Sequence, residues 1–321
     1  MATNDMTGVS GTAGAGLPPR PSLTAPSKRY GEKIIRALLG ACAALSIAVT
    51  VAIVVSLIEP AIEFFTEVPL NDFLFGTEWA PTFQPASFGV LPIVGGTLLI
   101  TFWALIVAIP MGLGAAIFLS EYASPRVRKT IKPLLEVLTG IPTVAIGFFA
   151  LFFMRPLLED LLPFMDWTGP QAAGVAGLAV GLMVVPIIAS ISEDAMRAVP
   201  NGLREGAYAL GSTKMKVALR VVFPAALSGI VASVVLGASR AIGETMIVLL
   251  AAGASPNLTF GFTESVQTMT AFIGQTATGD IATGTITYYT IFAVGLLLFV
   301  MTLILNMISM RLVRRFREVY D

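Results

Sequence analysis

Two residues of opposite charge lie within an otherwise apolar stretch, and their types and spacing define the chemistry available there. Arg240 and Glu244 stand four residues apart within residues 226–252. In one continuous helix this spacing places both side chains on the same face, within pairing distance. Charged groups inside a membrane span are costly and mark functional positions by default. The pair is either an anion site or gate on a pathway or a structural ion pair. We favour the pathway, because packing alone would be served better by apolar residues.

Residue types that many other chemistries require are absent or scarce. The chain of 321 residues contains no histidine and a single cysteine, Cys42. This composition excludes an imidazole base, an internal disulfide and a cysteine-based metal site. The phosphate-binding pattern G-x-x-x-x-G-K-[ST] does not occur, so the chain is not expected to bind ATP. We therefore expect no catalytic residues, no metal and no cofactor on this chain; its energy would come from a partner or an ion gradient.

The charged pair must be positioned by membrane-spanning helices. The chain is 55% hydrophobic and only 12% charged, whereas soluble domains carry about 25% charged residues. Six apolar runs each reach the roughly 20 residues that cross a bilayer, and lipid requires each run to satisfy its own backbone as a helix. The expected fold class is thus an all-α membrane protein with six transmembrane helices. The runs are residues 34–57, 91–119, 131–154, 171–190, 226–252 and 285–310.

The lysines and arginines distinguish the two sides of the membrane. Eighteen of the twenty lie before the first run, after the last, between runs two and three or four and five, or, for Arg36 and Lys132, within three residues of the start of runs one and three. Arg155 is the only basic residue in the remaining loops, and Arg240 lies inside a run. Basic loops stay in the cytoplasm, so both termini are expected to be cytoplasmic in a multi-pass protein of the inner membrane.

The same pattern divides the chain into regions. Residues 1–30 are rich in Gly, Ser, Thr and Pro and predict a disordered cytoplasmic tail. Residues 31–321 are expected to form one transmembrane domain. The first external connection is acidic and aromatic, which fits either a solvated loop edge or a docking surface for an external partner. Its marked residues are Glu59, Glu63, Glu67, Asp72, Phe73, Phe75, Glu78, Trp79 and Phe83.

The cytoplasmic connection between the fourth and fifth runs, about residues 196–224, is much longer than the 2–8 residues usual between helices. Residues 202–211 predict a short helix ended by Gly211, a residue suited to the left-handed position after a helix. Residues 214–222 predict a second, amphipathic helix. Its apolar side would comprise Met215, Leu219 and Val222.

This connection resembles the EAA loop of ATP-binding-cassette (ABC) importer permeases, whose pattern is E-A-A-x3-G-x9-I-x-L-P. Gly206, Val221 and Phe223 stand where that pattern has Ala, Ile and Leu, and the other defined positions match. The resemblance implies that the loop inserts into a groove on a cytoplasmic ATPase; the alternative is an ordinary amphipathic surface helix. The residues implied in coupling are Glu205, Gly206, Ala207 and Gly211.

Three further stretches resemble phosphate-specific permeases of the PstC type. Residues 239–245 are similar to their R-A-x-G-E-T segment, residues 140–147 to G-I-P-S-x-x-x-G in the third span, and residues 75–98 to the first external loop and second span. The resemblance extends from about residue 30 to the C-terminus and implies a type I ABC importer (MetI-like) permease fold. The implied partners are a second, PstA-type permease, two copies of an ATPase that binds ATP, and an extracytoplasmic phosphate-binding protein, with no nucleic acid.

The chemistry of the charged pair agrees with phosphate. A guanidinium with five donors suits an anion of this shape, and Glu244 would neutralise Arg240 when no anion is bound. Thr143 and Thr245 are candidate hydroxyl donors, although a threonine in a membrane helix commonly bonds its own backbone. We expect a permease subunit of an ATP-driven phosphate importer. The alternatives are an ABC permease for another solute such as sulfate or molybdate, an ion-coupled secondary transporter, or a membrane sensor.

Overall fold

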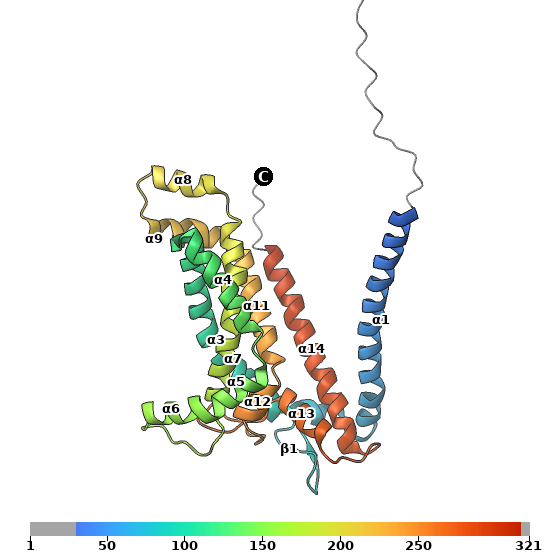
Figure 1. Ribbon diagram of the computed structural model, residues 1–321. Coiled ribbons are helices and arrows are strands. Elements are labelled where there is room, and N and C mark those ends of the chain that lie inside the picture. Colours follow the sequence, from blue (N-terminus) through green and yellow to red (C-terminus); the bar gives the residue numbers. More distant parts are fainter. Residues whose placement is uncertain (1–29, 316–321) are drawn as a thin grey trace, which may run out of the picture. The chain divides into compact units, whose positions relative to one another are not determined.

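The computed structural model describes residues 30–315 and is predominantly helical (Figure 1). The chain divides within helix α1 (Tyr30–Glu67) into two units, Met1–Ala52 and Ile53–Asp321. The interactions discussed below all lie within the second unit. The predicted tail, residues 1–30, lies outside the described residues except for Tyr30, which begins α1.

Four helical segments in the described chain are long and apolar enough to cross a bilayer, and two bent helix pairs raise the number to six if each pair is one span. This agrees with the predicted all-α membrane fold. The four segments are α1, α3 (Leu91–Ile117) with its π-helical continuation η1 (Phe118–Tyr122), α7 (Ala173–Arg197) and α14 (Ile286–Arg315).

The third span differs from the single helix predicted for residues 131–154. The helix breaks after Thr139, and the segments on either side of the break meet at 88°. Pro142 explains the break, because it has no N–H to donate and disfavours helical backbone at Ile141 before it. The span comprises α4 (Pro125–Thr139), α5 (Thr143–Phe149), the π-helical η2 (Ala150–Met154) and α6 (Arg155–Leu161).

The fifth span also differs from the single helix predicted for residues 226–252. A bend of 74° at Ala226 separates the preceding helical stretch from α11, and residues 243–245 separate α11 from α12. The elements are α9 (Lys214–Val217), the π-helical η3 (Ala218–Val222), α10 (Phe223–Ala225), α11 (Leu227–Ile242) and α12 (Met246–Ala251).

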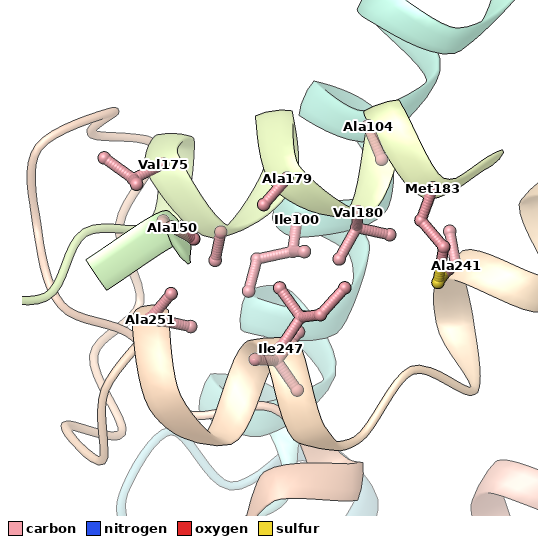
Figure 2. Close-up of a cluster of buried hydrophobic side chains, with 14 of the residues drawn as sticks. Ile100, Ala104, Ala150, Val175, Ala179, Val180, Met183, Ala241, Ile247 and Ala251 are labelled. Atoms are coloured by element: carbon pink, nitrogen blue, oxygen red, sulfur yellow. The ribbon is translucent and has the colours of Figure 1, made fainter. Parts of the chain in front are cut away.

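The main core forms where α7 packs along α3. Gly177 and Gly181 of α7 allow this approach, because a Cβ at either position would meet α3 at Trp103 or at the carbonyl of Ala104. Figure 2 shows how side chains from five elements meet at this core. They come from α3 (Ile100, Ala104), η2 (Ala150), α7 (Val175, Ala179, Val180, Met183), α11 (Ala241) and α12 (Ile247, Ala251).

A second, aromatic core lies around the first long connection. It includes α2 (Leu70–Phe75), α13 (Met269–Thr278) and an antiparallel hairpin of β1 (Trp79–Ala80) and β2 (Ser87–Phe88). The rings of Phe73 and Trp79 are buried in edge-to-face contacts, whereas Phe75 and Phe83 are exposed. Only part of this aromatic set is therefore available to solvent or to an external partner, and both readings of the loop stay open. Three of the acidic residues, Glu59, Glu63 and Glu67, belong to α1 and not to the loop.

The long connection between α7 and α11 carries α8 (Asn201–Ala209). In Figure 1, α8 and α9 lie at one end of the second unit, together with the C-terminal end of α14. The hairpin, α6, α12 and α13 lie at the opposite end. The two candidate sites, α8 and the break between α11 and α12, are thus separated along the length of the spanning helices.

Candidate functional site

The break between α11 and α12 is built around the carboxylate of Glu244. This side chain is 2% exposed, and Glu244 stands two residues after Ile242, the last residue of α11. Its Oε1 accepts hydrogen bonds from the N–H groups of Met246 (3.1 Å) and Ile247 (3.3 Å), in the first turn of α12. The first N–H groups of a helix lack partners within it and carry partial positive charge, so a carboxylate is stabilised there. Glu244 therefore starts α12, which explains why residues 226–252 do not form one helix.

Arg240 pairs with the other oxygen of this carboxylate. Its Nη1 donates to Glu244 Oε2 at 2.6 Å, so the pairing predicted from the sequence is present. The reason given for it is wrong, because α11 ends between the two residues and they do not share one helix face. The ion pair instead joins the last turn of α11 to the break.

The two members of the pair differ in exposure. The Arg240 side chain is 41% exposed, in contrast to the buried carboxylate. Within the described residues Glu244 is the only hydrogen-bond partner of this guanidinium, which has five N–H donors. Arg240 thus presents unused donors at the surface of the chain, while a buried carboxylate balances its charge.

A threonine that sequence reasoning missed fixes the break to α13. Thr270 Oγ1 donates to the backbone carbonyl of Glu244 at 2.6 Å and lies 3.1 Å from the hydroxyl of Thr268. Thr268 in turn caps α13 by accepting from the N–H of Ala271 at 3.0 Å. The break is therefore held from two sides, by α12 and by the start of α13.

The two candidate threonines lie near this break with different contacts. Thr245 directly follows Glu244, and its Oγ1 lies 3.5 Å from the carbonyl of Gly243. Thr143 begins α5, which packs against α12 through Gly147. Among the described residues Thr143 makes no hydrogen bond to the charged pair. The structure therefore brings together Arg240, Glu244 and Thr245, whereas Thr143 lies on the neighbouring helix α5.

At the other end of the spanning helices, α8 ends as the sequence predicts. Gly211 has a φ of +77°, the left-handed conformation that favours glycine. The N–H of Ser212 donates to the carbonyl of Ala207 at 3.1 Å, and the N–H of Gly211 donates to that of Tyr208 at 2.9 Å. This pair of bonds is the Schellman motif, which satisfies the last carbonyls of a helix. The turn therefore has a defined shape.

The side chains of α8 have few contacts with the rest of the chain. None of its residues is buried, and Glu205 and Gly206 are exposed. Leu203, Tyr208 and the following Leu210 expose apolar surface, and Leu210 is 88% exposed. An apolar surface next to a rigid turn suits contact with another protein.

The helical stretch after the turn corrects one prediction. Met215 and Leu219 are exposed, and the buried face instead contains Val217, Ala218 and Val222. The π-helical turn η3 explains the difference, because it places residues five apart, such as Val217 and Val222, on one face. A periodicity of 3.6 residues selects the wrong side chains here.

A second ion pair, which the sequence did not predict, positions α8. Arg204 Nη2 donates to Glu121 Oε1 of η1 at 3.1 Å and to the carbonyl of Met196 at 2.8 Å, and Nη1 donates to the carbonyl of Val199 at 2.6 Å. Both charged side chains are largely buried. Because Arg204 and Glu121 lie 83 residues apart, no local pattern in the sequence could identify the pair.

Arg155 is fixed within the chain at the opposite end. It donates to Glu159 Oε2 at 2.8 Å and to the carbonyl of Gly169, and its guanidinium lies 4.1 Å from the ring centre of Trp167. The carboxylate of Glu159 is exposed. These contacts hold the loop after α6 in place, so this basic residue is a structural anchor of that loop.

Comparisons with known proteins find relatives over most of the chain. It is 34% identical over 270 residues to the "Probable ABC transporter permease protein YqgH" of Bacillus subtilis, covering 83% of this chain and 86% of that protein. It is 33% identical over 265 residues to the "Phosphate transport system permease protein PstC" of Pasteurella multocida, covering 77% and 80%. The resemblance noted from the sequence motifs is thereby confirmed.

Solved structures share the fold at low sequence identity. A bacterial alginate ABC transporter matches with a TM-score of 0.60 at 16% identity, covering 92% of this chain and all of that one. The MetNI methionine ABC transporter matches with a TM-score of 0.52 at 19% identity, covering 72% and 95%. The predicted MetI-like permease fold is thus confirmed. The family described as "Binding-protein-dependent transport system inner membrane component" matches residues 108–318, a range that contains α8 and the Arg240–Glu244 pair. The chain therefore belongs to this family of inner membrane components of binding-protein-dependent transport systems.

Proposed function

We propose that this chain is a permease subunit of an ATP-driven phosphate importer. The observation that carries the proposal is the half-exposed guanidinium of Arg240 beside the buried carboxylate of Glu244. Phosphate offers several strong acceptor oxygens, and a guanidinium with unused donors suits it. Relatives named as phosphate transport permeases support the same substrate.

Arg240 has two alternative partners in the pathway, the carboxylate of Glu244 and phosphate. Without substrate, Glu244 neutralises Arg240 and keeps the cation tolerable within the membrane protein. An arriving phosphate competes with Glu244 for the guanidinium, and the carboxylate keeps its two bonds to the first turn of α12. Thr245, the next residue, adds a hydroxyl at the same break, and Thr143 adds one from the start of α5.

The segment around α8 is the proposed coupling element. Its residues Glu205, Gly206, Ala207 and Gly211 form a short helix and a rigid left-handed turn with little contact to the rest of the chain. We place the groove of a partner ATPase over this surface. ATP is bound and hydrolysed by that partner, and this chain carries no cofactor of its own.

The assembly follows from the same assignment. A second permease of the PstA type completes the pathway, two copies of the ATPase dock on the α8 side, and an extracytoplasmic phosphate-binding protein delivers substrate at the opposite side. Residues 31–321 form the permease domain, residues 196–224 its coupling segment, and residues 1–30 a tail.

Both termini are placed in the cytoplasm of a multi-pass inner-membrane protein. The charge distribution supports this orientation, as does the C-terminal end of α14, which lies at the same end of the second unit as α8 (Figure 1). A reporter enzyme that works only outside the cytoplasm, fused after Asp321, is expected to be inactive. Strong activity of that fusion would reverse the orientation.

The substrate is tested by uptake of radiolabelled inorganic phosphate into cells that lack this chain, with and without its gene restored. We expect restored uptake that survives collapse of the proton gradient while ATP is present, and that excess sulfate or molybdate does not inhibit. Equal inhibition by sulfate or molybdate would assign another solute. Loss of uptake with the proton gradient at constant ATP would instead indicate a secondary transporter.

A further inference from the structure

The α8 end of the structure contains a buried carboxylate that none of the assigned functions uses. Glu193 of α7 is 0% exposed, and three cations surround it. Lys132 Nζ lies 2.8 Å from its Oε2, while Arg128 Nε and Arg197 Nε lie 3.5 and 3.7 Å from its Oε1. Lys132 also bonds the exposed Asp194. Two of the three cations, Arg128 and Lys132, come from α4.

These charges determine where α4 lies on α7. None of the α4 side chains is buried, so apolar packing defines its position only weakly. A buried ion pair adds little net stability, since apolar residues of similar volume serve as well or better. It does fix geometry, because Lys132 Nζ must reach Glu193 Oε2 to donate its hydrogen bond. The charges around Glu193 therefore set the register of α4 rather than the stability of the fold.

Arg128 connects this cluster to the anchor of α8. Its Nε donates to the carbonyl of Leu119 at 3.0 Å, and Nη2 donates to that of Ser120 at 3.4 Å. The next residue, Glu121, holds Arg204 of α8 at 3.1 Å. Arg128 thus contacts the segment that receives α8 while it also contacts Glu193.

The contacts continue from α4 toward the proposed pathway. α4 ends at Thr139, and the break through Pro142 leads into α5. α5 packs on α12 through Gly147, and α12 begins at the carboxylate of Glu244. Contacts therefore run without interruption from α8 through Glu121, Arg128, α4 and α5 to the break between α11 and α12.

We propose that a polar brace transmits movement of the ATPase-bound α8 to the break at Pro142, before α5. The brace consists of Glu121, Arg128, Lys132, Glu193 and Arg204. Glu121 and Glu193 are its positioning residues. The inference rests on the proposed function, because it needs an ATPase on α8 and a substrate at Arg240. Neither α8 nor α4 has a buried side chain, and both are held by this brace. Packed interfaces shift between discrete arrangements and do not deform continuously, so a small movement at α8 can be passed on as a whole.

The test compares ATP hydrolysis with uptake of inorganic phosphate in the complete reconstituted complex. Glu121→Gln and Glu193→Gln each remove one carboxylate charge. We expect both complexes to retain their ATPase and its hydrolysis but to lose uptake about tenfold, the size of a typical coupling energy. ATP consumed per phosphate imported rises accordingly. Glu121→Asp keeps the charge and should restore most of the coupling.

Glu159→Gln is the matched control, because it also breaks an ion pair with an arginine, but at the opposite end of the unit. It should leave the ratio of ATP to phosphate unchanged. If Glu193→Gln does not insert, Glu121→Gln decides alone, since Arg204 keeps its two carbonyl bonds in that variant. An unchanged ratio in Glu121→Gln would overturn the brace. Absence of ATP-dependent uptake in the unaltered complex would contradict the proposed function instead.

Discussion

The two candidate sites, α8 and the break between α11 and α12, differ in what they leave exposed, although each pairs an arginine with a buried carboxylate. In α8 no side chain is buried, and Arg204 holds the helix to the rest of the chain through contacts with η1 and α7. At the break the carboxylate of Glu244 is buried, and the neighbouring α12 contributes Ile247 and Ala251 to the main core (Figure 2). α8 thus exposes apolar surface, whereas the break exposes part of a guanidinium beside a buried carboxylate.

Under the proposed function, this difference distinguishes a surface that binds a protein from a site that binds an ion. A surface that docks a partner needs exposed area and a rigid shape, which α8 and the turn at Gly211 provide. A site for an anion inside a membrane needs a cation whose cost is offset when it is empty, which Glu244 provides for Arg240. Changes at the two regions should therefore fail in different ways, and the following predictions use that difference.

The largest effect is expected from Arg240→Gln, which removes the charge but keeps length and some hydrogen bonding. Loss of charge-assisted bonds to phosphate should lower uptake by about tenfold or more. Assembly and ATPase binding should persist, because Glu244 retains its bonds to Met246 and Ile247. Uptake assays together with copurification of the ATPase check both parts. Normal uptake with a full complement of ATPase would show that the arginine does not contact substrate.

Gly211→Val should break coupling and spare the substrate site. A β-branched residue at a φ of +77° costs roughly 1–2 kcal/mol or more and distorts the turn after α8. We expect reduced copurification of the ATPase and reduced uptake, with normal insertion into the membrane. Gly211→Asn is the matched control, because asparagine tolerates this backbone conformation, and it should behave much like the unaltered chain. Full ATPase binding by the valine variant would remove the turn from the docking surface.

A smaller effect is expected from Thr245→Val, which keeps the side-chain shape and removes the hydroxyl. If this hydroxyl contacts phosphate, the apparent KM for phosphate should rise by about fivefold, equivalent to one hydrogen bond of about 1 kcal/mol. Thr245→Ser should preserve the KM. Equal kinetics in all three proteins would mean that the hydroxyl serves only its contact with the carbonyl of Gly243.

No effect is expected from deletion of residues 2–27, which belong to neither region. This segment is rich in Gly, Ser, Thr and Pro and has no apolar periodicity. Phosphate uptake per inserted chain should match that of the full chain. A lower uptake at equal expression would assign the tail a function that its composition does not reveal.

The sequence predicts those features of this fold that arise within one stretch of chain. Run length predicts the spans of α1, α3, α7 and α14, and Gly211 predicts the turn after α8. The spacing of Arg240 and Glu244 also predicts their pairing, although a capped helix start at Glu244, and not a shared face, brings them together. In this case the carboxylate of Glu244 binds the first N–H groups of α12 and starts a new helix there, although the apolar run continues.

Features that depend on distant residues could not be predicted in the same way. Arg204 and Glu121 are separated by 83 residues, and Lys132 and Glu193 by 61. No property of either partner's own surroundings identifies the other. The π-helical turn η3 likewise changes which side chains after Gly211 are buried, since a single inserted residue shifts the buried face. These contacts position the candidate sites. The sequence therefore indicates the residues of the sites better than the distant residues that hold them in place.

The central claim is that Arg240 acts on the substrate and not merely as the partner of Glu244, and the double variant Arg240→Gln with Glu244→Gln tests it most directly. The amide oxygen of the new glutamine still accepts from the first turn of α12, and no unpaired charge remains, so the break should keep its structure. Uptake of radiolabelled phosphate is measured alongside assembly with the ATPase. We predict normal assembly with phosphate uptake as low as in Arg240→Gln alone. Near-normal uptake in the double variant would contradict the account and make the pair a purely structural one.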